Sequence, residues 1–136
     1  MPIQFPVAPG TVLLCDYDLG GFQPPEMTKR RPAVVVSPRL PYRDGLCAVV
    51  PLSGSEPQRE LRYVVRVELS DDLPHPFPQH IWWAKCDMVA TVAFKRLDLF
   101  RTERGSDGKR RYLHPKLPTA EFDRIKAGVL AGLGLD

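Results

Sequence analysis

Fifteen prolines and ten glycines are spread through the 136 residues and divide the chain into short segments. Proline removes a backbone donor and blocks the interior of a helix, and glycine favours turns. The apolar runs between these breaks are short and rich in valine, as strands are. The sequence therefore predicts a mainly β fold.

Six or seven segments fit short strands, because each is apolar or alternating and is bounded by turn residues. The expected strands are residues 11–18, 32–37, 46–52, 62–69, 81–85, 88–92 and 96–102. Within 62–69, Val65, Val67 and Leu69 alternate with Arg66 and Glu68, which predicts one buried face. Short strands with turns between them indicate a small barrel or sandwich.

One amphipathic helix is expected at the C-terminal end, starting at Pro118–Thr119 with Thr119 as its cap. Gly134 is expected to end it, because glycine adopts the left-handed conformation readily. Its expected apolar stripe consists of Phe122, Ile125, Val129 and Leu133.

Length and composition predict a single domain over residues 1–136, with a net charge of +3. No apolar run is long enough to span a bilayer, and the first residues lack the layout of a signal peptide, so we expect a cytoplasmic protein with no membrane contact. Cys15, Cys47 and Cys86 lie far apart in apolar segments. We expect buried thiols rather than disulfides or a zinc site.

Positive charge gathers between Lys95 and Lys116, where eight lysines and arginines stand against three acidic residues. This excess favours an anionic partner, but a run such as Lys109–Arg111 beside glycines is more often a solvated hairpin tip. We expect the hairpin tip.

Three short motifs follow one another with a distinctive spacing. They are Arg31-Pro32 followed by valines, then Val49-Val50-Pro51-Leu52-Ser53, then Lys85-Cys86-Asp87. With the terminal helix, they resemble the PemK/Kid/MazF family of type II toxin-antitoxin toxins, the mRNA interferases. The resemblance covers nearly the whole chain. It implies an SH3-like small barrel that forms a homodimer, cleaves single-stranded RNA without a metal or other cofactor, and binds a cognate antitoxin protein.

The resemblance also implies a reaction in which the ribose 2′-OH attacks the adjacent phosphate and leaves a 2′,3′-cyclic phosphate and a 5′-OH. Arg31 matches the family's loop arginine, whose planar fork can hold a phosphate at two points. Ser53 takes the family's Thr/Ser position, where a hydroxyl can donate to a phosphate oxygen. Without the resemblance, Arg31 reads as a surface ion-pair partner and Ser53 as a turn residue.

Lys85 and Asp87 are two residues apart, so in an extended segment they project from the same face, as suits an acid and a base. The alternative is a structural ion pair. The family's best-studied pattern has arginine at the first position, and some members carry a histidine in the loop that here spans residues 20–31 and contains none. His75, His80 and His114 are expected at the surface, with no metal.

Bases of single-stranded RNA need flat side chains and nearby cations. The expected RNA-binding residues are Phe22, Tyr42, Arg39, Arg43 and, as a second hydroxyl, Ser55. Of Trp82 and Trp83, one must face inward. We expect the outward one to cover a dimer interface or the terminal helix rather than stack on a base.

Two other functions are compatible with the same fold. One is a toxin that binds a topoisomerase without catalysis, and whose functional residues gather at the end of the helix. The other is an SH3-like interaction module whose catalysis has decayed, in keeping with the missing loop histidine and with Lys85.

Overall fold

The computed structural model describes residues 2–102, 104–113 and 115–136. Within these ranges the chain forms nine strands, two single-turn 3₁₀ helices and one α-helix. The strands are β1 Val12–Asp16, β2 Arg30–Val35, β3 Leu46–Ser53, β4 Val64–Glu68, β5 Ile81–Lys85, β6 Ala90–Ala93, β7 Leu97–Asp98, β8 Phe100–Arg101 and β9 Tyr112–Leu113. The helices are η1 Cys86–Met88, η2 Phe94–Arg96 and α1 Thr119–Leu133.

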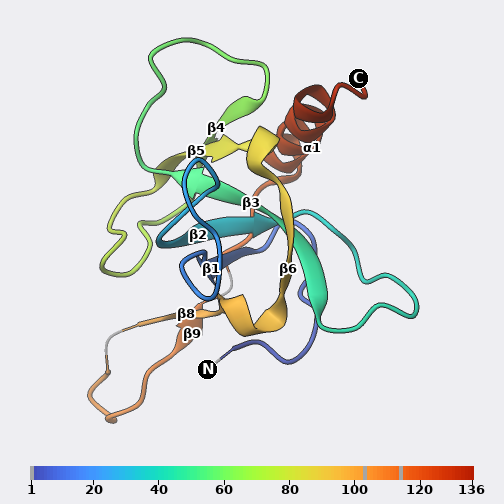
Figure 1. Cartoon of the computed structure of the whole chain (residues 1–136). Helices are drawn as coiled ribbons and strands as arrows, with labels where there is room; N and C mark the ends of the chain where they lie inside the picture. The colour runs from blue at the N-terminus through green and yellow to red at the C-terminus, as the bar shows by residue number, and fades with distance from the viewer. Residues whose placement is uncertain (1, 103, 114) are drawn as a thin grey trace.

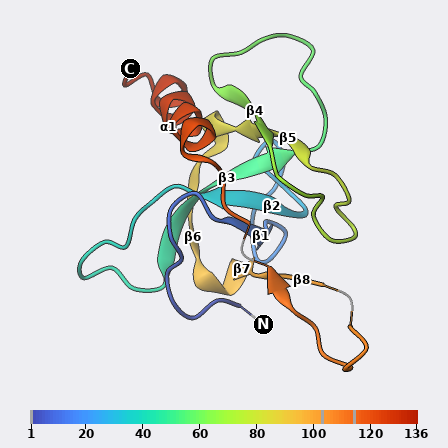
Figure 2. The ribbon, with the colours of Figure 1, turned by 180° about the vertical axis from the view of Figure 1, so that it is seen from behind.

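The strands form one antiparallel sheet and a separate ribbon. The sheet has the order β4-β5-β3-β2-β1-β7, with β6 also paired to β3, and β8 pairs only with β9. In Figures 1 and 2, α1 and the β8–β9 hairpin lie at opposite ends of the molecule. The mainly β fold with one C-terminal helix is confirmed. Closure of the sheet into a barrel stays a prediction.

Strand β3 is the centre of the sheet because it has three neighbours. Strand β2 pairs along one edge, where Ala33 faces Pro51. Strand β6 takes the first half of the other edge and β5 takes its end, where Ser53 faces Trp83. The pairing of β2 with β3 was expected from the sequence. Because the two strands are antiparallel, the start of β2 and the end of β3 lie at the same end of the sheet.

Alternation along the strands gives the sheet two apolar faces, each with its own core cluster. The helix face packs against α1 and includes Val12, Val34, Val50, Leu52, Val67 and Trp82. The other face, which we call the loop face, includes Leu13, Cys15, Tyr17, Ala33, Val35 and Val49. Phe22 and Met27, from the segment between β1 and β2, pack on the loop face. A strand side chain therefore reaches either α1 or this loop, according to its position in the alternation.

Helix α1 packs through a narrower stripe than the sequence predicts. Ile125 is fully buried, and Phe122 and Val129 pack at the edge of the core, which confirms three of the four expected positions. Leu133 is 54% exposed, so its expected burial is wrong. At that level the helix contacts η1 through a glycine, because a Cβ on Gly132 would lie 2.9 Å from the Cα of Asp87.

The two ends of α1 differ in how well they were predicted. Gly134 ends the helix with a φ of 70°, as expected. The expected capping role of Thr119 is wrong, because Pro118 occupies the N-cap position and no side chain caps the first turn. Glu121 in that turn instead accepts a hydrogen bond from the backbone N–H of Glu68, at 3.1 Å, and ties the helix to the end of β4.

The three cysteines are free and buried, as expected. Burial disfavours the charged thiolate and raises the pKa of Cys15 to about 12, of Cys47 to about 11 and of Cys86 to about 12. Cys15 and Cys47 belong to the loop-face cluster, and Cys86 belongs to the helix-face cluster. The thiols therefore act as apolar core groups on both sides of the sheet.

Candidate functional site

Arg31 is the second residue of β2 and faces Cys15 of β1, so its side chain belongs to the loop face. It is half-buried, and its Nε donates to the carbonyl oxygen of Thr28 at 2.9 Å. Burial lowers the pKa of Arg31, and nearby Tyr17 and Asp18 oppose that shift. A fixed and partly desolvated guanidinium is well suited to hold an anion.

The loop before Arg31 is fastened by a carboxylate. Asp18 accepts a hydrogen bond from the backbone N–H of Lys29 at 2.7 Å, and the carbonyl oxygen of Lys29 accepts one from Tyr17 N–H at 3.1 Å. Lys29 has a φ of 70°, a left-handed conformation that costs a residue with a side chain about 1–2 kcal/mol. These bonds hold the chain in that conformation immediately before Arg30 and Arg31.

Ser53 lies beside Arg31. The β2–β3 pairing ends at Ala33 and Pro51, and two residues beyond that pair, at the start of β2 and the end of β3, alternation places Arg31 and Ser53 on the loop face. Ser53 is half-buried, and its Oγ accepts a hydrogen bond from the backbone N–H of Ser55 at 3.3 Å. The structure thus places the two residues that the sequence singles out at neighbouring ends of β2 and β3 and on one face of the sheet.

Lys85 lies on the same face of the sheet, on the neighbouring strand β5. Asp87 does not project from that strand with it. Lys85 ends β5 and is half-buried, opposite Val64 of β4. The expectation that Asp87 projects with Lys85 from an extended segment is wrong, because the chain turns into η1 after Lys85. Asp87 is exposed, its backbone lies against Gly132 of α1, and among the described residues it makes no ion pair with Lys85.

Two residues on the loop face were not singled out as site residues by the sequence. Trp83 pairs with Ser53 on one side and with Arg66 on the other. Trp82 is buried on the helix face, so Trp83 points away from α1; of the two expected roles, cover of the terminal helix is wrong, and cover of a dimer interface stays a prediction. The signals were there, since alternation in 62–69 placed Arg66 outward and one of the paired tryptophans had to face outward.

Three of the expected RNA-binding residues lie far along the strands from Arg31. Arg39, Tyr42 and Arg43 belong to the 36–45 segment, which joins the other ends of β2 and β3, as Figure 1 shows. Arg39 and Arg43 line a pocket of about 290 Å³ together with Phe5 and Phe94, and Tyr42 is fully exposed. These three residues form a surface separate from Arg31 and Ser53.

The other two expected RNA-binding residues lie nearer to Arg31. The ring of Phe22 meets Tyr17 edge to face, with centroids 5.5 Å apart, and the guanidinium of Arg96 lies 4.7 Å from its centroid. Both contacts hold the half-buried ring in place, and its role in binding a base stays a prediction. Ser55 is exposed directly beyond Ser53.

Two of the three histidines, His75 and His80, lie within the described residues. His75 and His80 are exposed, as expected, and Nδ1 of His80 lies 2.7 Å from a carboxylate oxygen of Asp72. His114 lies outside the described residues. Across residues 2–102, 104–113 and 115–136, no three His, Cys, Asp or Glu side chains gather where they could hold a metal ion. No helix in the same ranges is long and apolar enough to cross a membrane.

The fold is shared with solved toxin structures. It is similar to an endoribonuclease in complex with its cognate antitoxin from a mycobacterial species, with a TM-score of 0.64 and 19% identity over 96% of this chain and 98% of that one. It is also similar to the Mycobacterium tuberculosis toxin MazF-mt6, with a TM-score of 0.61 and 16% identity over 93% and 98%. MazF from Deinococcus radiodurans matches with a TM-score of 0.57 and 14% identity over 96% and 98%. These likenesses define a MazF-like fold.

Sequence comparison is more specific. The family model of PemK-like, MazF-like toxins of type II toxin-antitoxin systems matches residues 8–130. The uncharacterized protein YifN of Escherichia coli (strain K12) is 33% identical over 150 aligned positions, which cover 98% of this chain and 95% of YifN. The chain therefore belongs to the PemK/MazF family of type II toxin-antitoxin toxins, a family of endoribonuclease toxins, as its motifs indicated.

Proposed function

We propose that this chain is an endoribonuclease toxin that cleaves single-stranded RNA in the cytoplasm without a metal or other cofactor. It acts as a homodimer and is held inactive by a cognate antitoxin, the kind of partner with which a mycobacterial endoribonuclease of the same fold was solved. The observation that supports cleavage most is that Arg31 and Ser53 lie on one face of the sheet at neighbouring ends of the adjacent strands β2 and β3. One phosphodiester can contact both.

Each side chain has a separate task in this reaction. Arg31 neutralises the negative charge on the phosphate oxygens, and the Ser53 hydroxyl donates a hydrogen bond to one of them. The ribose 2′-OH loses its proton to Asp87 and attacks phosphorus. The bond from phosphorus to the 5′ oxygen then breaks, and that oxygen takes a proton from Lys85. The products are a 2′,3′-cyclic phosphate and a 5′-OH.

The position of Arg31 favours this chemistry. Its Nε is already bonded to Thr28, so the other two nitrogens can face a ligand without the whole side chain having to be ordered. Partial burial also strengthens its attraction to the charge that develops at phosphorus. Of the four assigned roles, that of Asp87 as the base has the least support from the structure, because Asp87 lies on η1 rather than on β5.

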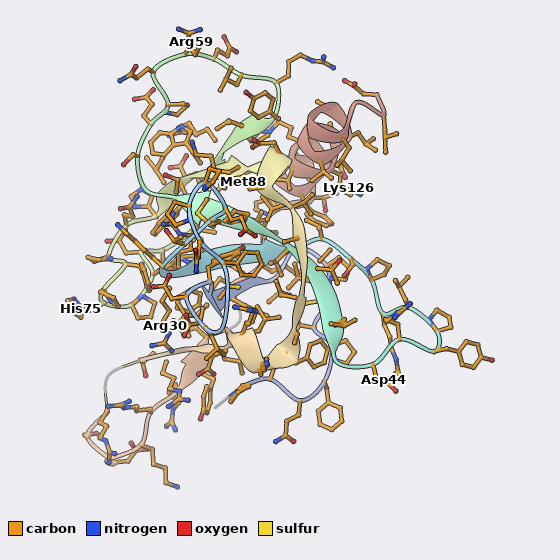
Figure 3. All side chains as sticks on the ribbon, in the orientation of Figure 1. Arg30, Asp44, Arg59, His75, Met88 and Lys126 are labelled. Carbon is orange, nitrogen blue, oxygen red and sulfur yellow. The ribbon has the colours of Figure 1, made fainter. Side chains whose placement is uncertain are left out.

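The test is to incubate the purified protein with a long RNA in EDTA and to analyse the new ends. We expect 2′,3′-cyclic phosphate and 5′-OH ends, with cleavage about 10²–10³-fold slower in Arg31→Ala, the loss typical of one transition-state donor. Arg59→Ala is the matched control, because Arg59 is exposed at the tip of the 54–63 loop in Figure 3. Its rate should equal that of the wild type.

Two further variants separate the proton-transfer roles. Lys85→Arg should retain more activity than Lys85→Ala if a cation at this position protonates the leaving oxygen, and Asp87→Asn should slow cleavage because asparagine cannot accept the proton of the 2′-OH. RNA that stays intact with the wild type refutes cleavage and favours the two alternatives, a toxin that binds a topoisomerase or an SH3-like interaction module whose catalysis has decayed. Cleavage that is equal in Arg31→Ala and Arg59→Ala refutes this site.

A further inference from the structure

The β8–β9 hairpin forms one wall of a groove that the site described above does not use. The groove has a volume of about 430 Å³, and its cationic and aromatic lining includes Arg30, His75, Phe77, Phe100, Arg101 and Arg110. A second hollow adjoins it and shares Pro74, His75, Arg101 and Arg110. In Figure 3, Arg30 and His75 lie on the side of the molecule from which this hairpin projects. The expected solvated hairpin tip is confirmed, since residues 104–111 are exposed, and Arg110 of that tip also lines the groove.

The charges in the groove are only partly neutralised by the protein. Arg101 pairs with Asp98, with 3.3 Å between Nη2 and Oδ2, and Asp72 in the adjoining hollow pairs with His80. The guanidinium groups of Arg30 and Arg110 have no hydrogen bond or ion pair with any residue that the structure describes. Asp16 and Asp98 lie near Arg30, but two exposed arginines that face one groove and form no ion pair with a described residue favour an anionic ligand.

Arg30 connects this groove to the candidate catalytic site. Arg30 faces Asp16 and Arg31 faces Cys15 across the β1–β2 pair, so the two consecutive arginines point to opposite faces of the sheet. Strand β2 begins at Arg30, so the two arginines leave the same end of one strand, where the 17–29 segment joins it. A flexible polyanion held at Arg31 can pass this end and continue into the groove.

We propose that this groove binds the stretch of single-stranded RNA that adjoins the phosphate held at Arg31, with Arg30, Arg101 and Arg110 contacting its backbone. The inference rests on the proposed function, whose substrate it extends from one phosphodiester to several nucleotides. The half-buried ring of Phe77 in the groove gives one base an apolar surface, and the arginines contact the phosphates. Such a site binds RNA largely irrespective of sequence.

The test measures binding separately from cleavage. A fluorescein-labelled 12-nucleotide RNA with 2′-O-methyl groups lacks the nucleophile, so its anisotropy reports binding alone. Arg110→Gln is compared with Lys109→Gln, since Lys109 neighbours Arg110 and carries the same charge but does not line the groove. Both side chains are exposed, so both variants should fold, which circular dichroism checks.

We expect Arg110→Gln and Arg30→Gln each to weaken binding about tenfold and to lower the slope of log K against log salt by about 0.7, and Lys109→Gln to change binding less than about twofold. Equal losses in Arg110→Gln and Lys109→Gln, or no binding by the wild type, overturn the proposal. So does a poly-glutamate peptide that binds through Arg110 more tightly than RNA.

Failure of the proposed function gives a different result. The 12-nucleotide RNA would then still depend on Arg110, but a cleavable RNA of the same sequence would stay intact with the wild type. Conversely, if cleavage needs Arg31 but RNA binding is unchanged in the Arg30 and Arg110 variants, the proposed nuclease activity is supported and the proposed RNA-binding groove is refuted.

Discussion

Gly128→Ala is expected to destabilise the protein, although alanine is the better helix former. A Cβ at position 128 would lie 2.8 Å from Sγ of Cys86, 3.1 Å from its Cβ and 3.2 Å from Cγ2 of Val65. Comfortable contacts between nonbonded heavy atoms need about 3.5–4.0 Å, so α1 or η1 must move by several tenths of an ångström. Overpacking of this kind costs about 1–3 kcal/mol, against a gain of about 1 kcal/mol from helix propensity. The expected net loss in the free energy of unfolding is about 1 kcal/mol.

Urea unfolding followed by circular dichroism measures this loss, with an unchanged m-value showing that the unfolding reaction is the same. Ala127→Gly, on the exposed side of the same turn, isolates the propensity effect and should cost about 1 kcal/mol. Cys86→Ala removes the nearest clashing atom, so in that background Gly128→Ala should become neutral or stabilising. The reasoning is refuted if Gly128→Ala stabilises the wild type, or if its cost is the same with and without Sγ.

Three other outcomes are expected. Ile125→Ala should lower the free energy of unfolding by about 2–5 kcal/mol, because Ile125 is fully buried. Leu133→Ala should change it by less than about 0.5 kcal/mol, because Leu133 is exposed. Denaturant titration measures both, and equal losses would contradict this prediction. In the folded state Cys15, Cys47 and Cys86 keep their protons above the ordinary thiol pKa of 9.0, whereas the unfolded chain loses them. The free energy of unfolding should therefore fall as pH rises above 9.0 towards about 11–12, by roughly 1 kcal/mol per thiol and pH unit. A flat profile in unfolding titrations would count against buried thiols. Asp18→Ala should slow RNA cleavage about tenfold, because it frees the loop before Arg31. Asp44→Ala in the 36–45 segment should not slow cleavage. Single-turnover rates compare the two variants, and equal rates would refute a positioning role for Asp18.

The sequence predicted elements whose boundaries depend on local signals. Residues 81–85 form β5 as expected, because alternation and flanking turns define them. Residues 96–102 were expected to form one strand but divide at Leu99 into β7 and β8. Distant partners decide this break, since β7 pairs with β1 and β8 with β9. Such pairings are not visible in a local apolar pattern.

The candidate site was predictable where it depends on neighbouring strands and not where the chain turns. Two valine-rich segments that follow each other pair, so the proximity of Arg31 and Ser53 follows from the sequence. The turn η1 was missed because Cys86, Asp87 and Met88 carry no proline or glycine signal. Gly128 and Gly132 permit that turn, because they have no side chains and so let α1 approach η1 closely. They lie over 40 residues later in the chain.

The bridge between Pro2 and Asp98 fixes the start of the chain beside β7. Pro2, Arg30 and Asp98 also line a common hollow, so a purification tag fused before Met1 would emerge close to Arg30. A tag fused after Asp136 would instead emerge beyond α1, at the far end of the molecule in Figure 2. Affinity handles and fluorophores for nucleic-acid measurements therefore belong at the carboxyl terminus.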